Sequence, residues 1–112
     1  MKLVALVALS AALLVPSALA ATPLVGTVGP GFTITLTQGG KKVTKLKAGT
    51  YTIKVADKSN IHNFRLKGPG VNKTTTVPGK GNFTWKVTLK KGTYTVVCDP
   101  HAAVMKQTFK VA

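Results

Sequence analysis

Residues 83–98 read Phe-Thr-Trp-Lys-Val-Thr-Leu-Lys-Lys-Gly-Thr-Tyr-Thr-Val-Val-Cys, and this stretch decides the fold. Apolar and polar residues alternate with a period of two on both sides of the turn pair Lys91-Gly92. Because successive side chains of a β-strand point to opposite faces, each run places its apolar residues on one face and its Thr and Lys residues on the other. The stretch therefore predicts two half-buried strands separated by a turn, with Phe83, Trp85 and Tyr94 in the core.

The same alternation recurs in the rest of the chain. From Leu24 onward no stretch has the apolar spacing of a helix over three turns, and turns rich in Gly and Pro separate the alternating runs. Short strands at this spacing, without a repeat or a linker, predict a single all-β domain built as an antiparallel sandwich or barrel. The further runs are Phe32-x-Ile34-x-Leu36, Tyr51-x-Ile53-x-Val55, His62-x-Phe64-x-Leu66 and Phe109-x-Val111.

The alternation also assigns two polar side chains to the inner face. His62 is two positions from Phe64, and Cys98 is two and four positions from Val96 and Tyr94, so each has the same parity as these apolar residues and lies on the same face of its strand. Both residues stand where a predicted strand runs into a loop. Strand pairing could therefore bring an imidazole and a thiol together at one end of the domain.

Residues 1–20 have the pattern of a secretory signal peptide. After Met1-Lys2 comes an apolar run, then Pro16, then the small-residue ending Ala-Leu-Ala at 18–20. A positive start, an apolar middle and an A-x-A ending predict cleavage after residue 20 and export of residues 21–112 to a periplasm, the cell envelope or the outside. The alternative is a retained membrane anchor, but Pro16 interrupts the run before it reaches the about 20 apolar residues that span a bilayer. We therefore expect no stable membrane insertion after cleavage.

The chain is small and strongly basic. Its 112 residues include 16 Lys plus Arg against 2 Asp and no Glu, and removal of residues 1–20 with their one Lys leaves a net charge of +13. Such a charge indicates a solvated basic surface or a docking surface for an anionic partner. We expect no nucleic-acid binding, because neither a helix for the major groove nor interleaved exposed aromatic residues are predicted.

Few side chains of residues 21–112 can carry chemistry: one Cys, two His, one Met and two Asp. The acids are Asp57 and Asp99, which lie 42 positions apart, so catalysis by paired neighbouring carboxylates can be set aside. A single Cys cannot form a disulfide within the chain. Residues 21–112 can therefore form at most one metal centre with nitrogen and sulfur ligands.

Three of these side chains lie on one segment, where Cys98, His101 and Met105 have the spacing C-x2-H-x3-M, and the second imidazole is His62. Two imidazoles, a thiolate and a weak axial thioether are the ligands of blue-copper electron-transfer sites. Two other interpretations stay open. In one, Cys98 is an ordinary buried thiol. In the other it is the nucleophile of a Cys-His-Asp triad, which is less favoured because only the adjacent Asp99 could assist.

Five short segments carry a family resemblance: His62-Asn63-Phe64, Gly92-Thr93-Tyr94, Cys98-Asp99-Pro100-His101, Met105 and Thr108-Phe109-Lys110-Val111. With these segments, residues 21–112 resemble the cupredoxins, the blue-copper proteins of the plastocyanin and azurin kind, over essentially their whole length. The resemblance implies an antiparallel Greek-key β-sandwich of seven to eight strands that holds one type 1 copper ion.

The resemblance also implies the ligands. Cys98 would be the thiolate ligand, His62 and His101 the imidazole ligands, and Met105 the axial ligand. Familiar members with a C-x2-H start have two or four residues between the loop His and the Met, whereas three follow here. Met105 remains the expected axial ligand because it is the only Met after residue 20, and the backbone carbonyl of Ile61 is the alternative.

Two neighbours of the ligands have implied roles. Asn63 would donate its backbone N–H to the Cys98 sulfur and tie the two ligand loops together through its side chain. Pro100 lies where some members offer the sulfur a second N–H. Because proline has no N–H, we expect Cu(II) to be better stabilised and the reduction potential to be lower.

The function implied is that of a one-electron carrier that cycles copper between Cu(II) and Cu(I). An enzyme is not expected, because four protein ligands leave no open position for a substrate. The electron would pass through the imidazole edge of His101, beside a small apolar docking patch of Ala102, Ala103 and Val104, to a redox protein. Surrounding Lys residues would steer an acidic partner to this monomer.

Two further functions remain open. An envelope protein that stores or delivers copper would use the same ligands as a carrier. A cationic sandwich without a metal would use none of them.

Overall fold

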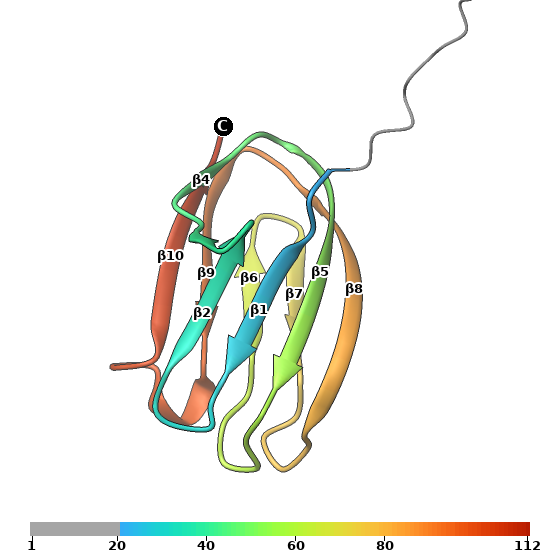
Figure 1. The fold of residues 1–112 in the computed structure, drawn as a ribbon. Coiled ribbons are helices and arrows are strands. Elements are labelled where there is room, and N and C mark those ends of the chain that lie inside the picture. Colours follow the sequence, from blue (N-terminus) through green and yellow to red (C-terminus); the bar gives the residue numbers. More distant parts are fainter. Residues whose placement is uncertain (1–20) are drawn as a thin grey trace, which may run out of the picture.

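The structure is a computed structural model that describes residues 21–112; the predicted signal peptide at 1–20 lies outside the described residues. Ten strands of the described part form two facing sheets, ordered β3-β2-β1-β5-β8 and β4-β10-β9-β6-β7 (Figure 1). The all-β sandwich predicted from the sequence is confirmed, with ten strands rather than seven to eight. The elements are β1 (Leu24–Val28), β2 (Ile34–Gln38), β3 (Lys41–Lys42), β4 (Lys45–Leu46), β5 (Gly49–Asp57), β6 (Arg65–Gly68), β7 (Val71–Thr74), β8 (Gly81–Leu89), β9 (Gly92–Val97), the 3-10 turn η3 (Asp99–His101) and β10 (Lys106–Val111).

The stretch 83–98 forms β8 and β9, which belong to opposite sheets. The chain thus crosses from one sheet to the other at the turn after β8. Tyr94 holds this crossing, because its hydroxyl accepts a hydrogen bond from the Lys90 N–H at 2.8 Å and donates one to the Pro69 carbonyl at 2.9 Å. The turn therefore closes one end of the sandwich.

The strand pairs are mostly antiparallel, with two exceptions. β1 runs parallel to β5, and the short β4 runs parallel to the end of β10. Alternation of side chains is the same in parallel and antiparallel strands, so the sequence pattern could not distinguish them. The purely antiparallel arrangement expected from the sequence is corrected in these two pairs.

The core lies between the sheets and is filled by their inward side chains. Tyr94 and Phe109 stack with ring centroids 5.5 Å apart. One buried polar side chain joins the sheets: the Gln107 side chain accepts a hydrogen bond from the Leu36 N–H and donates to the carbonyls of Leu36 and Val43, each at 3.0 Å. The Gln107 side chain thereby satisfies backbone N–H and C=O groups of β2 in the way that a neighbouring strand would. It also links β10 to the opposite sheet.

Two aromatic residues expected in the core lie partly outside it. Phe83 is 40% exposed and Trp85 is half-buried, although both have the inward parity of β8. β8 is an edge strand of its sheet, so its inner face is open to solvent along one side. No helix in residues 21–112 is long and apolar enough to cross a membrane.

Candidate metal centre

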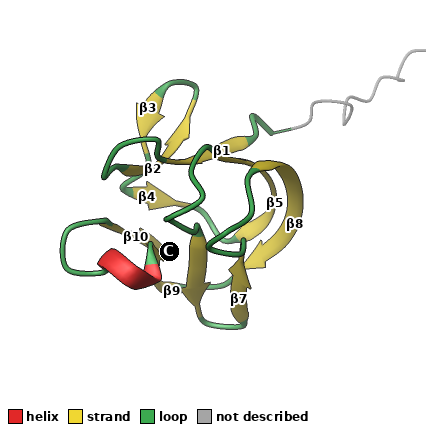
Figure 2. Cartoon of the chain, turned by 90° about the horizontal axis from the view of Figure 1, so that it is seen from below, coloured by secondary structure: helices red, strands yellow, loops and turns green. Residues whose placement is uncertain are grey.

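Two loops at the same end of the sandwich carry the candidate ligands. One loop, residues 58–64, joins β5 to β6, and the other, residues 98–105, joins β9 to β10. Both lie at the lower end in Figure 1, and the view from that end shows the short helical turn of the second loop in red (Figure 2). The inward parity predicted for His62 and Cys98 is confirmed, because both side chains are fully buried.

Three ligand atoms converge between the loops. The Nδ1 atoms of His62 and His101 lie 3.1 Å apart, and Cys98 Sγ lies 3.6 Å from each of them. A point equidistant from the three atoms is about 2.0 Å from each, close to the metal–nitrogen distance of about 2.0–2.1 Å and below the metal–sulfur distance of about 2.3 Å known for protein-bound zinc. Two imidazoles and a thiol in this arrangement fit one copper ion.

The backbone of the second loop folds back on itself. The Cys98 N–H donates to the Met105 carbonyl at 3.1 Å, and the N–H groups of His101 and Met105 donate to the carbonyls of Cys98 and His101 at 3.1 and 2.9 Å. Pro100 stands in the first turn of η3, where a missing N–H removes no hydrogen bond. The fold thus places the buried Met105 directly opposite Cys98, at the base of the β9–β10 connection.

Asn63 ties the two loops together through its side chain. Its Nδ2 donates to Asp99 Oδ2 and to Thr74 Oγ1, both at 2.9 Å, and its Oδ1 accepts from the Asp99 N–H at 2.7 Å. A hydrogen bond from the Asn63 backbone N–H to the Cys98 sulfur is not found among residues 21–112; the polar neighbours of that sulfur are the two imidazoles. Asn63 therefore connects the segments that hold His62 and Cys98.

Sequence reasoning missed Arg65, which extends this connection. Its guanidinium donates to both carboxylate oxygens of Asp99, at 2.8 to 3.1 Å, and to Asn72 Oδ1 at 2.7 Å. The hydrogen bonds from Arg65 and Asn63 hold the pKa of Asp99 below its usual range, and the same carboxylate raises the pKa of Arg65. The available signal was that Arg65 is the only arginine of the chain, placed two residues after Asn63.

Phe32 was expected to point into the core, and the structure places it over the site instead. It precedes β2 and is 58% exposed. Its ring packs edge-on against both imidazoles, with centroids 4.9 Å from His62 and 4.8 Å from His101. Phe32 therefore shields the two rings from one side.

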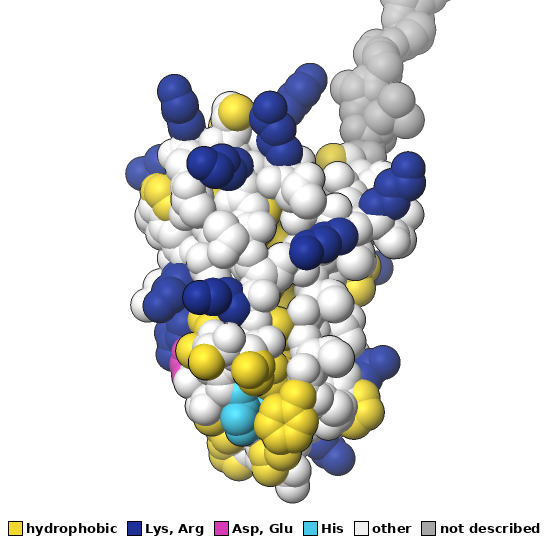
Figure 3. All heavy atoms as spheres, turned by 90° about the vertical axis from the view of Figure 1, so that its left-hand side faces the viewer, with side chains coloured by type: hydrophobic (Ala, Val, Ile, Leu, Met, Phe, Trp, Pro, Cys, Tyr) yellow, Lys and Arg dark blue, Asp and Glu magenta, His cyan; other side chains and the backbone are white. Residues whose placement is uncertain are grey.

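The surface around the half-buried His101 is apolar. Phe32, Ile61 and Val104 are large hydrophobic side chains that are exposed, and the three residues of the predicted docking patch, Ala102 to Val104, are all exposed. In Figure 3 hydrophobic side chains surround the histidine at this end, whereas most of the Lys and Arg side chains visible on this face lie farther from it. The one candidate ligand that reaches the surface thus does so among apolar groups.

The buried and the exposed parts of the loop connection should differ in their effect on stability. We expect Asn63→Ala to lower the free energy of unfolding of the metal-free protein by about 2–3 kcal/mol, because it removes three hydrogen bonds of about 1 kcal/mol each. Arg65→Met should cost about 1 kcal/mol or less, because the Arg65–Asp99 pair is exposed. Urea unfolding measures both, with the exposed Lys54→Met as a control near zero; equal losses in all three variants would contradict this account.

A family model described as copper binding proteins of the plastocyanin/azurin family matches residues 28–112. A search of curated protein sequences finds no match. Among solved structures, auracyanin A, a blue copper protein of the green thermophilic photosynthetic bacterium Chloroflexus aurantiacus, is 17% identical with a TM-score of 0.56; the match covers 83% of this chain and 100% of that one. Reduced rusticyanin is 25% identical with a TM-score of 0.53, over 80% of this chain and 77% of that one. Rusticyanin from Thiobacillus ferrooxidans is 24% identical with a TM-score of 0.50, over 80% and 75%.

Proposed function

Because the chain belongs to the plastocyanin/azurin family of copper-binding proteins, we propose that it is an exported one-electron carrier with one type 1 copper ion. In this proposal the mature form comprises residues 21–112 and acts as a monomer in a periplasm, in the cell envelope or outside the cell. The convergence of two Nδ1 atoms and one Sγ within 3.6 Å of each other carries the proposal. The proposed ligands are His62, Cys98, His101 and, in the axial position, Met105.

A copper ion bound there supplies reversible one-electron chemistry between Cu(II) and Cu(I). The contribution of the protein is to hold its ligand atoms in one arrangement for both oxidation states. His62 and Cys98 are fully buried, and the Asn63 side chain joins their loops by two hydrogen bonds to Asp99. A site held in this way needs little rearrangement when an electron arrives or leaves.

The proposed electron route runs through the imidazole of His101, since the His62 ring is enclosed. Phe32, Ile61 and the patch Ala102 to Val104 offer an apolar surface around this ring. A partner can approach such a surface closely without trapping ordered water. The Phe32 ring also limits the access of water to both imidazoles.

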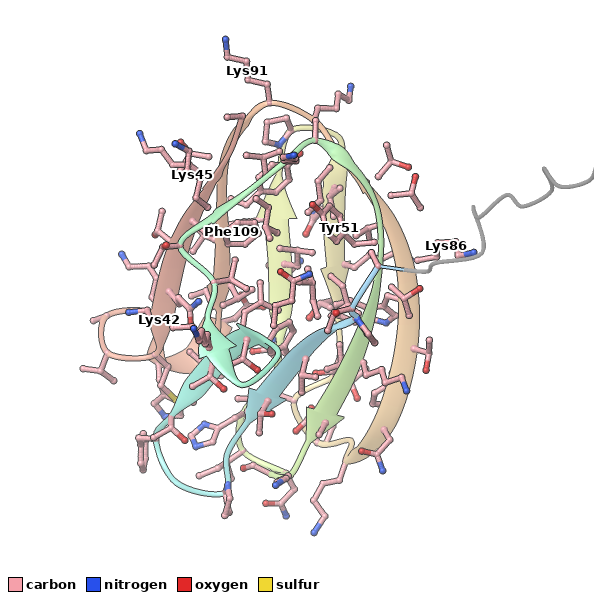
Figure 4. All side chains as sticks on the ribbon, turned by 45° about the horizontal axis from the view of Figure 1, so that its top comes forward. Lys42, Lys45, Tyr51, Lys86, Lys91 and Phe109 are labelled. Atoms are coloured by element: carbon pink, nitrogen blue, oxygen red, sulfur yellow. The ribbon has the colours of Figure 1, made fainter. Side chains whose placement is uncertain are left out.

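The lysines would steer a redox partner with an acidic surface. Within residues 21–112 no lysine forms an ion pair with either acid, because Asp57 is buried and Asp99 pairs with Arg65. Figure 4 shows charged side chains extending outward from the sandwich, among them Lys42, Lys45, Lys86 and Lys91. We expect the association rate with such a partner to fall as salt is added, because the Debye length shortens.

The purified protein loaded with Cu(II) tests the proposal. We expect an intense blue absorption band, reversible one-electron reduction and retention of the ion when a Cu(I) chelator is added in moderate excess. If no such band forms, the assignment of the site fails. If the band forms but the reduced protein gives up its copper to the chelator faster than it exchanges electrons, the function is copper storage or delivery with the same ligands.

A further inference from the structure

Asp57 is a buried acid that the electron-carrier function does not use. It is the last residue of β5, directly before the loop that bears His62, and it is 2% exposed. The one side-chain ion pair in residues 21–112 joins Arg65 and Asp99, so no Lys or Arg of the described chain neutralises Asp57. Burial of a carboxylate without a cation is costly. The hydrogen bonds that the carboxylate accepts should therefore offset this cost.

The carboxylate of Asp57 fixes both ends of loop 58–64. Its Oδ1 accepts a hydrogen bond from the Ser59 N–H at 3.2 Å, at the start of the loop. Its Oδ2 accepts from Thr75 Oγ1 at 2.7 Å, and the same Thr75 hydroxyl accepts from the Phe64 N–H at 2.9 Å, at the end of the loop. The Thr75 N–H also donates to the Phe64 carbonyl at 3.0 Å. The backbone on both sides of His62 is thus tied to one carboxylate.

The interior of the loop is held by the same group of contacts. Ser59 Oγ accepts a hydrogen bond from the Ile61 N–H at 3.1 Å, which fixes the residue before His62. Gly29 lies close on the other side: a Cβ added there would lie 2.7 Å from Ser59 Cβ and 3.6 Å from His62 Cδ2. The loop therefore has little room to move once Asp57 holds its ends.

We propose that Asp57 is a positioning residue of the metal centre, which holds the His62 loop in place and whose buried negative charge favours the oxidised form of the bound ion. The second part rests on the proposed function. With two neutral imidazoles and one thiolate, the site carries one more positive charge with Cu(II) than with Cu(I). A fixed negative charge inside the protein attracts the oxidised form more strongly, because the local dielectric is low.

The expected size of the charge effect follows from the path between the groups. Two hydrogen bonds and two residues separate the Asp57 carboxylate from His62, a distance on the order of 10 Å. At an effective dielectric of about 20, the interaction between two unit charges at that separation changes an equilibrium constant roughly tenfold. Here that constant is the ratio of the Cu(II) affinity to the Cu(I) affinity of the site. We therefore expect Asp57→Asn to lower the ratio of Cu(II) affinity to Cu(I) affinity about tenfold, which raises the potential of a one-electron couple by about 59 mV.

Three variants separate position from charge. Asp57→Asn keeps the shape and an acceptor for Ser59 but removes the charge. Thr75→Val keeps the charge but removes the hydroxyl that joins Asp57 to Phe64. Lys58→Gln, on the neighbouring exposed side chain, changes the net charge by one unit in solvent and serves as the control.

Two measurements on the full mature chain decide the proposal. In the metal-free protein, amide hydrogen exchange at Phe64 should become at least about tenfold faster in Thr75→Val, because this N–H loses its acceptor at the end of the loop. In the copper-loaded protein, the potential should rise in Asp57→Asn and stay near the wild-type value in Lys58→Gln.

Unchanged amide exchange in Thr75→Val would overturn the positioning role, and a potential of Asp57→Asn equal to that of Lys58→Gln would overturn the charge effect. If the wild type shows no reversible copper couple, the proposed function fails, while the exchange measurement on the metal-free protein still decides the positioning role. Should Asp57→Asn not fold, exchange in Thr75→Val decides the positioning role and the charge effect is abandoned.

Discussion

Replacement of Cys98 by serine is expected to abolish the blue absorption of the copper-loaded protein and to lower its Cu(I) affinity more than about 100-fold, beyond the 10–100-fold typical of changes at outer-shell partners. The sulfur lies 3.6 Å from both Nδ1 atoms and is fully buried, and residues 21–112 contain no second cysteine. A serine hydroxyl is a hard donor that does not deprotonate at neutral pH, whereas a thiolate is soft and suits Cu(I).

Absorption spectra and competition with a Cu(I) chelator measure the effect of Cys98→Ser. Met105→Leu serves as the matched control, because loss of the proposed weak axial ligand should shift the band and the potential without abolishing either. The unfolding free energy of the metal-free Cys98→Ser protein should stay close to that of the wild type, since the two side chains have nearly the same shape. Retention of a normal blue band in Cys98→Ser would exclude the thiolate as a ligand.

The second large effect is expected for the core beneath the site. Phe64→Ala should lower the free energy of unfolding by about 3–5 kcal/mol, a large share of the about 5–15 kcal/mol that holds a typical domain together. The Phe64 ring is fully buried and packs so closely on β1 that a Cβ added to Gly26 would lie 2.4 Å from its Cζ. Its centroid is 6.0 Å from that of Trp85. The cavity left by alanine would lie two residues from His62.

Urea unfolding of the metal-free protein tests this expectation. Phe83→Ala removes the same chemical group from a position that is 40% exposed and should cost about 1 kcal/mol or less. Similar losses in the two variants would mean that Phe64 does not fill the core as its burial indicates.

Alternation along the chain predicted inward side chains in six strands and the convergence of two of the proposed ligands. His62 and Cys98 are buried on the inner face, as their parity required. The spacing C-x2-H-x3-M also placed His101 and Met105 on the loop that begins with Cys98. These are local properties, because side-chain direction in a strand and the composition of a loop depend on neighbours in the sequence.

The site has a further set of residues that no local pattern indicates. Phe32 lies 30 positions before His62 and packs on its ring, and Asp99 meets Arg65 across 34 positions. Asp57 reaches the end of the His62 loop only through Thr75, 18 positions away. Each contact depends on which strands pair and in which register. A strand pattern fixes neither.

The sequence by itself thus determined an all-β domain, the small set of side chains that can bind copper and the face on which two of them lie. Only the tertiary structure decided that β8 and β9 belong to opposite sheets, that β1 lies parallel to β5, and that the two imidazoles stand 3.1 Å apart beside the thiol. The physical reason is that alternation records the burial of single residues, whereas the geometry of a metal centre arises from hydrogen bonds and packing between segments far apart in the chain.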